Sequence, residues 1–274
     1  MRYNSTSFKK CGGIKIPKND RIKGKDSDLH IYVQFLYDPQ QEYLANAGWC
    51  QFLDILGPTH GDVNFNLSSL QGKKWDDPIE FNNLIEIVIH EITHILGFSY
   101  TDIPRWVTTD KTPHIKPTFK KNLRGIDTLF LRTPKVLEFA RQYFNCPTLD
   151  GMPLENIGDD GSVGSHWKST VIENEYMNAS VSNTQAYYSG FTANLLRDTG
   201  FYDEINESMV EKIFYGQGVG CQHITGQCDS NRREYCEPEI DDQLCDYYHL
   251  GASECSKAQQ ENVINMNVNL TDNK

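Results

Sequence analysis

The sequence predicts an α+β fold in which a sheet is followed by a long helix. Residues 29–36 (LHIYVQFL) carry the β-branched and aromatic side chains that are typical of a mostly buried strand. Residues 61–67 (GDVNFNL) alternate polar and apolar side chains, which indicates a second strand. Residues 84–96 are apolar almost all round, which is typical of a helix buried in a core. We therefore expect a twisted mixed sheet backed by this helix.

Composition and charge exclude several classes of protein. Hydrophobic residues make up 38% and charged residues 23% of the 274 residues, which is ordinary for a globular protein with one large domain or two small ones. The formal charge of -11 leaves no excess of Lys and Arg for phosphates, so we expect no nucleic-acid partner. We also expect no membrane span, since no apolar run of about 18 residues occurs. Neither the apolar core of a signal peptide nor a hydrophobic anchor tail is evident at the ends.

The eight cysteines favour disulfides. Five fall in the last quarter of the chain, at Cys221, Cys228, Cys236, Cys245 and Cys255. The even total and this clustering favour disulfides and an oxidising compartment. A second zinc site is the alternative, although no tight C-x-x-C pair occurs. Five N-x-S/T sequons point the same way and begin at Asn4, Asn66, Asn178, Asn206 and Asn269. Despite the missing leader, we expect a mature or incomplete secretory-pathway protein, located in a secretory lumen, at the cell surface or outside the cell.

The segment 61–67 has one apolar and one polar face. Val63 and Phe65 form the apolar face, and Asp and Asn residues alternate with them. Such a strand suits the edge of a sheet, where an extended peptide can add as a further strand along Gly61, Val63 and Phe65. An ordinary half-buried strand without a ligand fits the pattern equally well. The preceding strand, 29–36, lies between Cys11 and Cys50, and a bridge between those two cysteines would tie its flanks together.

The long helix has recognisable ends. Asp77 can cap its N-terminus, Pro78 fits the first helical position, and Glu80 completes a capping box. Gly97 is expected to end the helix just after Leu96.

The chain beyond the long helix is less regular. Four prolines between residues 101 and 135 indicate a long irregular segment that includes a short hairpin. Further helices are expected at about 137–144, 185–196 and 208–214. The glycine-rich segment 158–166 (GDDGSVGSH) is expected to be a loop that ends at a histidine.

The long helix carries His90, Glu91 and His94 in the H-E-x-x-H pattern. Residues four apart lie on one face of a helix, so both imidazoles can hold one ion. Buried polar groups are costly without partners, and Zn²⁺ is the partner that satisfies all three. In this pattern the glutamate handles the proton of the attacking water. The alternative is a pair of core histidines that bond to backbone carbonyls.

The third zinc ligand decides the class of site, because a catalytic zinc normally has three protein ligands. In thermolysin-like enzymes the first helix continues past the second histidine, whereas Gly97 ends it here; Glu138 would be the candidate ligand for such a site. The longer pattern H-E-x-x-H-x-x-G is that of metzincins, whose short form places a third histidine where this chain has Tyr100. The short form therefore fails.

The chain resembles one metzincin family in particular, the leishmanolysin metallopeptidases. In that family a long insertion separates the glycine from the third histidine. The segment GSVGSHWKSTVIENEYMNA resembles the family's third-ligand region and Met-turn, which implies that His166 is the third ligand and Met177 the turn methionine. The similarity to this family covers most of the chain and becomes weaker after about Cys228. It runs through KKCGGIKIP, AGWCQF, GDVNFN, YFNCPTLD, YYSGFTANLLRDTGFY and GQGVGCQ, in the family's order.

The resemblance implies a metzincin-type zincin fold in three parts. Residues 1–100 would hold the sheet and the zinc helix, 101–220 the insertion, third ligand and Met-turn, and 221–274 a Cys-rich fragment of the C-terminal domain. The family's pro-region and much of its C-terminal domain have no counterpart in these residues. By analogy with the family, the expected disulfides are Cys11–Cys50, Cys146–Cys221 and Cys236–Cys255, while Cys228 and Cys245 would pair with each other or stay reduced.

The function that the resemblance implies is zinc-dependent endopeptidase activity. His90, His94 and His166 would hold one Zn²⁺ per chain, and Glu91 would act as general base on the attacking water. A polypeptide substrate would lie extended along the strand at 61–66, antiparallel to it. A different class of function, a structural or adhesion component with an intact but unused zinc site, is the alternative.

Overall fold

A computed structural model describes most of the chain. The described residues are 9–41, 43–158, 161–179, 185–227, 234–236, 244–245, 249, 252–257 and 266–270. The chain divides into two compact units, Met1–Pro113 with Thr199–Asp203, and His114–Asp198 with Glu204–Lys274. Helices and sheets occur in both units, so the α+β class is confirmed. The three-part division at residues 100 and 220 remains a prediction.

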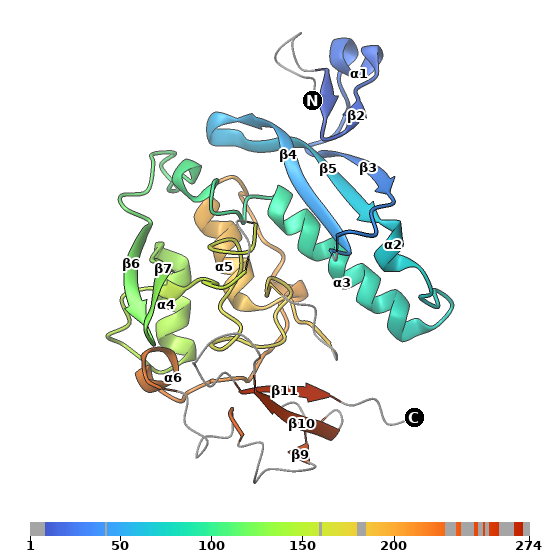
Figure 1. Cartoon of the computed structure of the whole chain (residues 1–274). Coiled ribbons are helices and arrows are strands. Elements are labelled where there is room, and N and C mark those ends of the chain that lie inside the picture. The colour runs from blue at the N-terminus through green and yellow to red at the C-terminus, as the bar shows by residue number, and fades with distance from the viewer. Residues whose placement is uncertain are drawn as a thin grey trace. The chain divides into compact units, whose positions relative to one another are not determined.

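The first unit contains a mixed three-stranded sheet in the order β3-β5-β4 (Figure 1). Strand β3 (His30–Leu36) pairs in parallel with β5 (Gly57–Asn66), from His30 opposite His60 to Leu36 opposite Asn66. Strand β4 (Ala45–Leu53) pairs with the other side of β5 and runs antiparallel to it. Both predicted strands are present, but no residue of β3 is buried, so the expectation of a mostly buried first strand is wrong. The sequence does not predict β4, because its start, ANAG, has no strand-like alternation.

The prediction that residues 61–66 form the edge of the sheet is wrong. These residues belong to β5, which has a strand on each side, so Gly61, Val63 and Phe65 have no free edge for a peptide. The polar face is not wet either: Asp62 is 7% exposed and Asn66 is fully buried. Alternation of side chains tells which face of a strand is apolar, but it carries no information about how many neighbours the strand has.

Short elements tie the edges of this sheet down. The strands β1 (Lys10–Cys11) and β2 (Ile14–Lys15) form a hairpin that leads to helix α1 (Lys18–Lys23). The expected disulfide Cys11–Cys50 is present and joins β1 to β4. Both cysteines are buried with Ile16, and Tyr32 of β3 packs on them.

Helix α3 (Pro78–Ile95) confirms the predicted long helix. The side chain of Asp77 accepts a hydrogen bond from the backbone N–H of Ile79, and Pro78 occupies the first turn. The helix packs against β4 and β5. Glu91, Thr93 and Ile95 are buried, but Ile85 is 41% exposed, so the expectation that residues 84–96 are buried in a core holds only for their C-terminal end. An apolar run shows what a helix can bury, and the packing partners decide how much it does bury.

The other short elements of the first unit are η1 (Asp54–Leu56), α2 (Leu67–Leu70) and η2 (Ile103–Arg105). Asn66, the last residue of β5, connects α2 to the sheet. Its Nδ2 donates to the carbonyl oxygens of Asp38 and Gln41, at 2.9 and 3.1 Å, and its Oδ1 accepts from the backbone N–H groups of Asp38 and Ser68. One buried amide thus closes the loop after β3 and caps α2.

We expect Asn66→Ala to lower the free energy of unfolding by about 1–3 kcal/mol, because it removes a buried side chain and the hydrogen bonds that partly buried backbone groups make to it. Urea denaturation monitored by circular dichroism measures the change. Asn46→Ala is the matched control, since Asn46 is exposed and bonds only to Asn64 among the hydrogen bonds described, and it should change stability by less than about 0.5 kcal/mol. Equal effects of the two substitutions would contradict this account of Asn66.

The second unit has a small antiparallel sheet and several helices. The strands β6 (Thr118–Leu123), β7 (Ile126–Leu131) and β8 (Met152–Pro153) are neighbours in that order, and β6 and β7 form the predicted hairpin. Helices α4 (Pro134–Tyr143) and α5 (Gly190–Thr199) confirm two of the expected helices within a few residues. The helix expected at 208–214 is wrong: only the single turn η3 (Glu207–Met209) forms there.

Aromatic side chains fill the core of the second unit. Phe191 of α5 lies in ring contact with Phe139, Tyr143, Phe144 and Trp167, at centroid distances of 4.8 to 6.0 Å. Such clusters bury large areas and favour edge-to-face arrangements. They fix α5 against α4 and against the segment that follows His166.

The C-terminal part contains helix α6 (Cys221–Thr225) and strands β9 (Leu244–Cys245), β10 (Ala252–Lys257) and β11 (Met266–Leu270). The expected disulfide Cys146–Cys221 is present, and Cys236 is also disulfide-bonded. Cys245 is free and exposed. Cys228 and the side chain of Cys255 lie outside the described part, so the pairing of Cys236 with Cys255 stays a prediction.

The sequons differ in accessibility. Asn66 is fully buried and hydrogen-bonded, and Asn178 is 7% exposed with its Nδ2 bonded to the carbonyl of Ile172. Asn206 is exposed. Asn4 and the side chain of Asn269 lie outside the described part. Within the described residues, no helix is long and apolar enough to cross a bilayer.

Candidate metal centre

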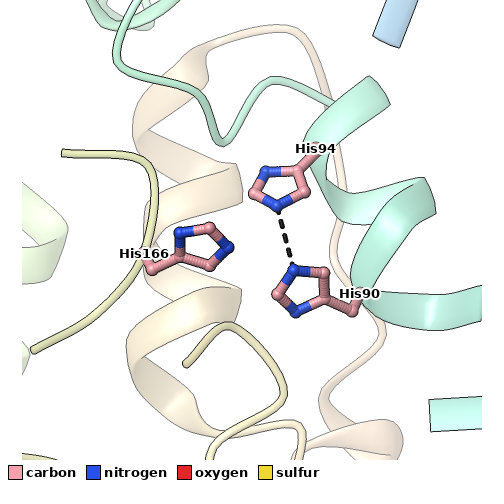
Figure 2. Close-up of side chains that lie close together, drawn as sticks. All are labelled: His90, His94 and His166. Carbon is pink, nitrogen blue, oxygen red and sulfur yellow. Dashed lines mark hydrogen bonds between the residues drawn. The ribbon is translucent and has the colours of Figure 1, made fainter. Parts of the chain in front are cut away.

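His90 and His94 project from one face of helix α3, as their spacing predicts (Figure 2). Their Nε2 atoms lie 3.0 Å apart, and the two rings meet nearly at right angles with centroids separated by 4.7 Å. The helix therefore points two ring nitrogens at one position, which is the arrangement that the H-E-x-x-H spacing provides.

The turn after α3 orients the ring of His94. Gly97 has φ 125°, a conformation that favours glycine, and the backbone N–H of Phe98 bonds back to the carbonyl of Thr93. The turn brings the carbonyl oxygen of Phe98 to 2.7 Å from Nδ1 of His94. A carbonyl can only accept, so Nδ1 carries the proton and Nε2 keeps its lone pair.

Glu91 lies one residue round the helix from His90 and is 7% exposed. Burial raises the pKa of its carboxyl group to about 7. An acidic group with a pKa near neutrality can both take up and release a proton at physiological pH.

His166 lies in the second unit and is 6% exposed. Its Nδ1 lies 3.0 Å from the carbonyl oxygen of Ser162, so this nitrogen is also the proton donor and Nε2 keeps its lone pair. The backbone around it is paired as well: the carbonyl of His166 accepts from the N–H of Glu155 at 2.8 Å, and Gly164 N–H donates to the carbonyl of Glu155 at 2.8 Å. The glycine-rich loop thus delivers a histidine that is held in one orientation and one tautomer.

Met177 lies next to the chain that follows His166. Its side chain is fully buried, and its carbonyl oxygen accepts a hydrogen bond from the N–H of Trp167 at 2.9 Å. Its own N–H donates to the carboxylate of Glu175 at 2.5 Å. A buried thioether in a tight turn is a packing element, which agrees with a supporting role for this methionine.

The three histidines form a group that fits a metal ion. One ring nitrogen from each of His90, His94 and His166 lies within 4.8 Å of the others. Figure 2 shows the three imidazoles. Neutral imidazoles are ligands that Zn²⁺ prefers, and the carbonyls bound to Nδ1 of His94 and His166 select the neutral tautomer that presents Nε2 as the metal-binding nitrogen. Glu138, the alternative third ligand, is exposed on α4 and does not belong to this group.

Comparison with known families identifies the chain. The family model described as leishmanolysin matches residues 2–273. The chain belongs to the leishmanolysin family. The resemblance drawn from the sequence and the metzincin fold that it implies are thereby confirmed.

Several curated relatives of this leishmanolysin-family chain cover much of it. A leishmanolysin homolog of Crithidia fasciculata is 29% identical over 89% of this chain and 36% of its own length. A leishmanolysin-like peptidase of Caenorhabditis elegans is 31% identical over 74% of this chain and 35% of its own length. Leishmanolysin of Leishmania major is 27% identical over 80% of this chain and 34% of its own length. The chain thus spans about a third of the length of these relatives.

Sequence reasoning about this leishmanolysin-family chain missed the groups that support the histidines. The carbonyls of Phe98 and Ser162 could not be found, because every residue has one and only the fold selects which one meets a ring. Glu175, which binds the backbone of Met177, also gave no signal, since a single glutamate in a polar segment looks the same whether it is buried or exposed.

Proposed function

We propose that this chain carries the catalytic site of a zinc-dependent endopeptidase. The observation that carries the proposal is the group of three ring nitrogens from His90, His94 and His166. A set of three imidazoles with a glutamate beside the first is the donor set of a hydrolytic zinc site and leaves a fourth position open. Membership of the leishmanolysin family supports the same class of chemistry.

In this proposal, the three histidines hold Zn²⁺ as neutral imidazoles through their Nε2 atoms. The carbonyls of Phe98 and Ser162 support this, because each binds the Nδ1 proton of one ring and makes the opposite nitrogen the lone-pair donor. When bound, Zn²⁺ supplies a Lewis acid that polarises the scissile carbonyl and lowers the pKa of water towards about 7.

Glu91 is proposed as the general base. Its carboxylate takes a proton from the attacking water and passes it to the departing amine, so the peptide bond breaks without a covalent intermediate. Burial of Glu91 in the C-terminal half of α3 supports the role. Shielding from bulk water holds the carboxyl group in place and prevents loss of the proton to solvent between its uptake and its delivery to the amine.

The proposed substrate is a polypeptide in extended form that adds to the edge of the sheet. Since β5 is the central strand, the strand that we propose for this role is β4, which packs against α3. Among the described residues, β4 has a strand partner on one side only. A side chain placed on Gly48, in the middle of β4, would meet no atom within 4 Å, so the face of the sheet at this residue has room for the side chains of a paired peptide.

Metal content and peptide cleavage test the proposed function together. The purified chain is expected to contain one zinc ion and to cleave casein, and removal of the metal with a chelator should stop cleavage until Zn²⁺ is added back. Zinc content comes from atomic absorption, and cleavage from release of labelled peptides. A chain that binds zinc and cleaves nothing would favour the structural or adhesion component with an unused site. A chain that binds no zinc would overturn both.

A further inference from the structure

Glu175 is a buried acid that the proposed mechanism does not use. It is 2% exposed and lies in the second unit, in the turn that contains Met177. Its Oε2 accepts from the N–H of Met177 at 2.5 Å. Its Oε1 accepts from the N–H of Ser189 at 3.3 Å and from the hydroxyls of Ser189 and Thr192 at 2.8 and 2.5 Å. All of these partners are uncharged donors.

These hydrogen bonds join the Met177 turn to the first turn of α5. Ser189 and Thr192 belong to the start of that helix, and Glu175 binds both. The carboxylate therefore holds together two segments that are separated along the chain. Burial raises the pKa of Glu175 to about 7, so ionising this acid has a free-energy cost that its hydrogen bonds offset only in part.

Thr192 extends the connection to the residue beside His166. Its Oγ1 donates to Glu175 and at the same time accepts from Nε1 of Trp167 at 2.9 Å. A hydroxyl has one proton, so donation to Glu175 leaves its lone pairs aimed at the indole N–H. Hydrogen bonds arranged in such a chain strengthen one another.

Trp167 is held at two points by the same assembly. Its indole N–H donates to Thr192. Its backbone N–H donates to the carbonyl of Met177 at 2.9 Å, and Glu175 binds the N–H of this same methionine. The side chain of Trp167 is fully buried and contacts Phe191 of α5. Since His166 directly precedes Trp167, the position of the Trp167 backbone sets where the histidine stands.

We propose that Glu175 is the positioning residue for His166, acting through Thr192 and the Met177 backbone on Trp167. The inference rests on the proposed function, because it assumes that His166 binds Zn²⁺. The two oxygens of a carboxylate accept from all four of these donors. A glutamine in its place would turn an N–H₂ group towards the N–H of Met177 or towards the start of α5.

The test compares Glu175→Gln with Asp198→Asn in the whole chain. Asp198 is the matched control: it is a carboxylate on α5, the helix whose start Glu175 binds, and it is 5% exposed and accepts from the backbone N–H groups of Lys135 and Val136 at the start of α4. Both substitutions should lower stability in urea. Only Glu175→Gln is expected to weaken binding of Zn²⁺, by about 10-fold in a chelator competition, at the lower end of the effect of losing a group bound directly to a ligand, because Glu175 acts on His166 through other residues.

A second pair of variants keeps the test decisive if Glu175→Gln does not fold. Thr192→Val keeps the shape and removes the hydroxyl, so it should weaken Zn²⁺ binding, whereas Thr192→Ser keeps the hydroxyl and should bind Zn²⁺ close to the parent chain. Equal Zn²⁺ affinity of Glu175→Gln and the parent, or of the two Thr192 variants, would overturn the inference. Failure of the parent itself to bind Zn²⁺ would instead overturn the proposed function.

Discussion

Glu91→Gln is expected to lower kcat/KM for peptide hydrolysis by about 10²–10⁴-fold while zinc content stays at the parent level. The amide has nearly the shape of the acid but cannot take a proton from water, and general-base catalysis is typically worth this factor. His90 and His94 are unchanged, so metal binding should persist. Stability should not fall, because Glu91 is a buried acid whose ionisation burial already disfavours. Glu91→Ala should be at least as inactive.

The matched control for Glu91→Gln is Glu80→Gln on the same helix. Glu80 lies in the first turn of α3 and forms a half-exposed ion pair with Lys73 at 3.1 Å, so its loss should leave both activity and zinc content unchanged. Initial rates on casein and on a short quenched-fluorescence peptide, with zinc measured on the same samples, separate the two effects. Casein cleavage by Glu91→Gln at the parent rate would remove Glu91 from the mechanism.

The long helix and the positions of two of the proposed ligands could be predicted from the sequence because their determinants are local. Asp77 and Pro78 define the start of α3, and the bond from Ile79 N–H to Asp77 is 2.8 Å, as a capping residue requires. Gly97 ends the helix because its backbone conformation is one that other residues avoid. The four-residue spacing then determines that His90 and His94 share a face, whatever the rest of the chain does.

The order of the strands could not be predicted in the same way. Pairing brings together residues that are distant in the chain, such as Ala45 and Phe65, and nothing in either segment identifies its partner. The central position of β5 depends on β4, whose Ala-, Asn- and Gly-rich start gives no strand signal. The edge was therefore assigned to the wrong strand.

His166 shows a different limit. Nothing in a glycine-rich loop distinguishes a metal ligand from a surface histidine, and only the resemblance of the whole GSVGSHWKSTVIENEYMNA segment to one family singled it out. In the structure the reason for its orientation is tertiary: a carbonyl of Ser162 on Nδ1 and backbone pairing with Glu155. Such determinants exist only after folding.

His166→Ala is expected to lower the affinity for Zn²⁺ by more than about 100-fold and to remove peptide cleavage. Loss of a partner behind a ligand typically costs 10- to 100-fold, so loss of the ligand itself should cost more. His90 and His94 would remain as a two-ligand site, which holds zinc weakly. Chelator competition gives the dissociation constant, and circular dichroism shows whether the variant is folded.

His114→Ala is the control for His166→Ala. His114 lies in the same unit, and its Nε2 donates to the carbonyl of Asp198 at 2.7 Å, so its loss should affect stability and leave zinc binding unchanged. If His166→Ala keeps the parent affinity, the third ligand lies elsewhere, and Glu138→Ala then tests the thermolysin-type alternative. The comparison is decisive because a two-histidine helix occurs in both kinds of site, whereas the identity of the third ligand belongs to only one of them.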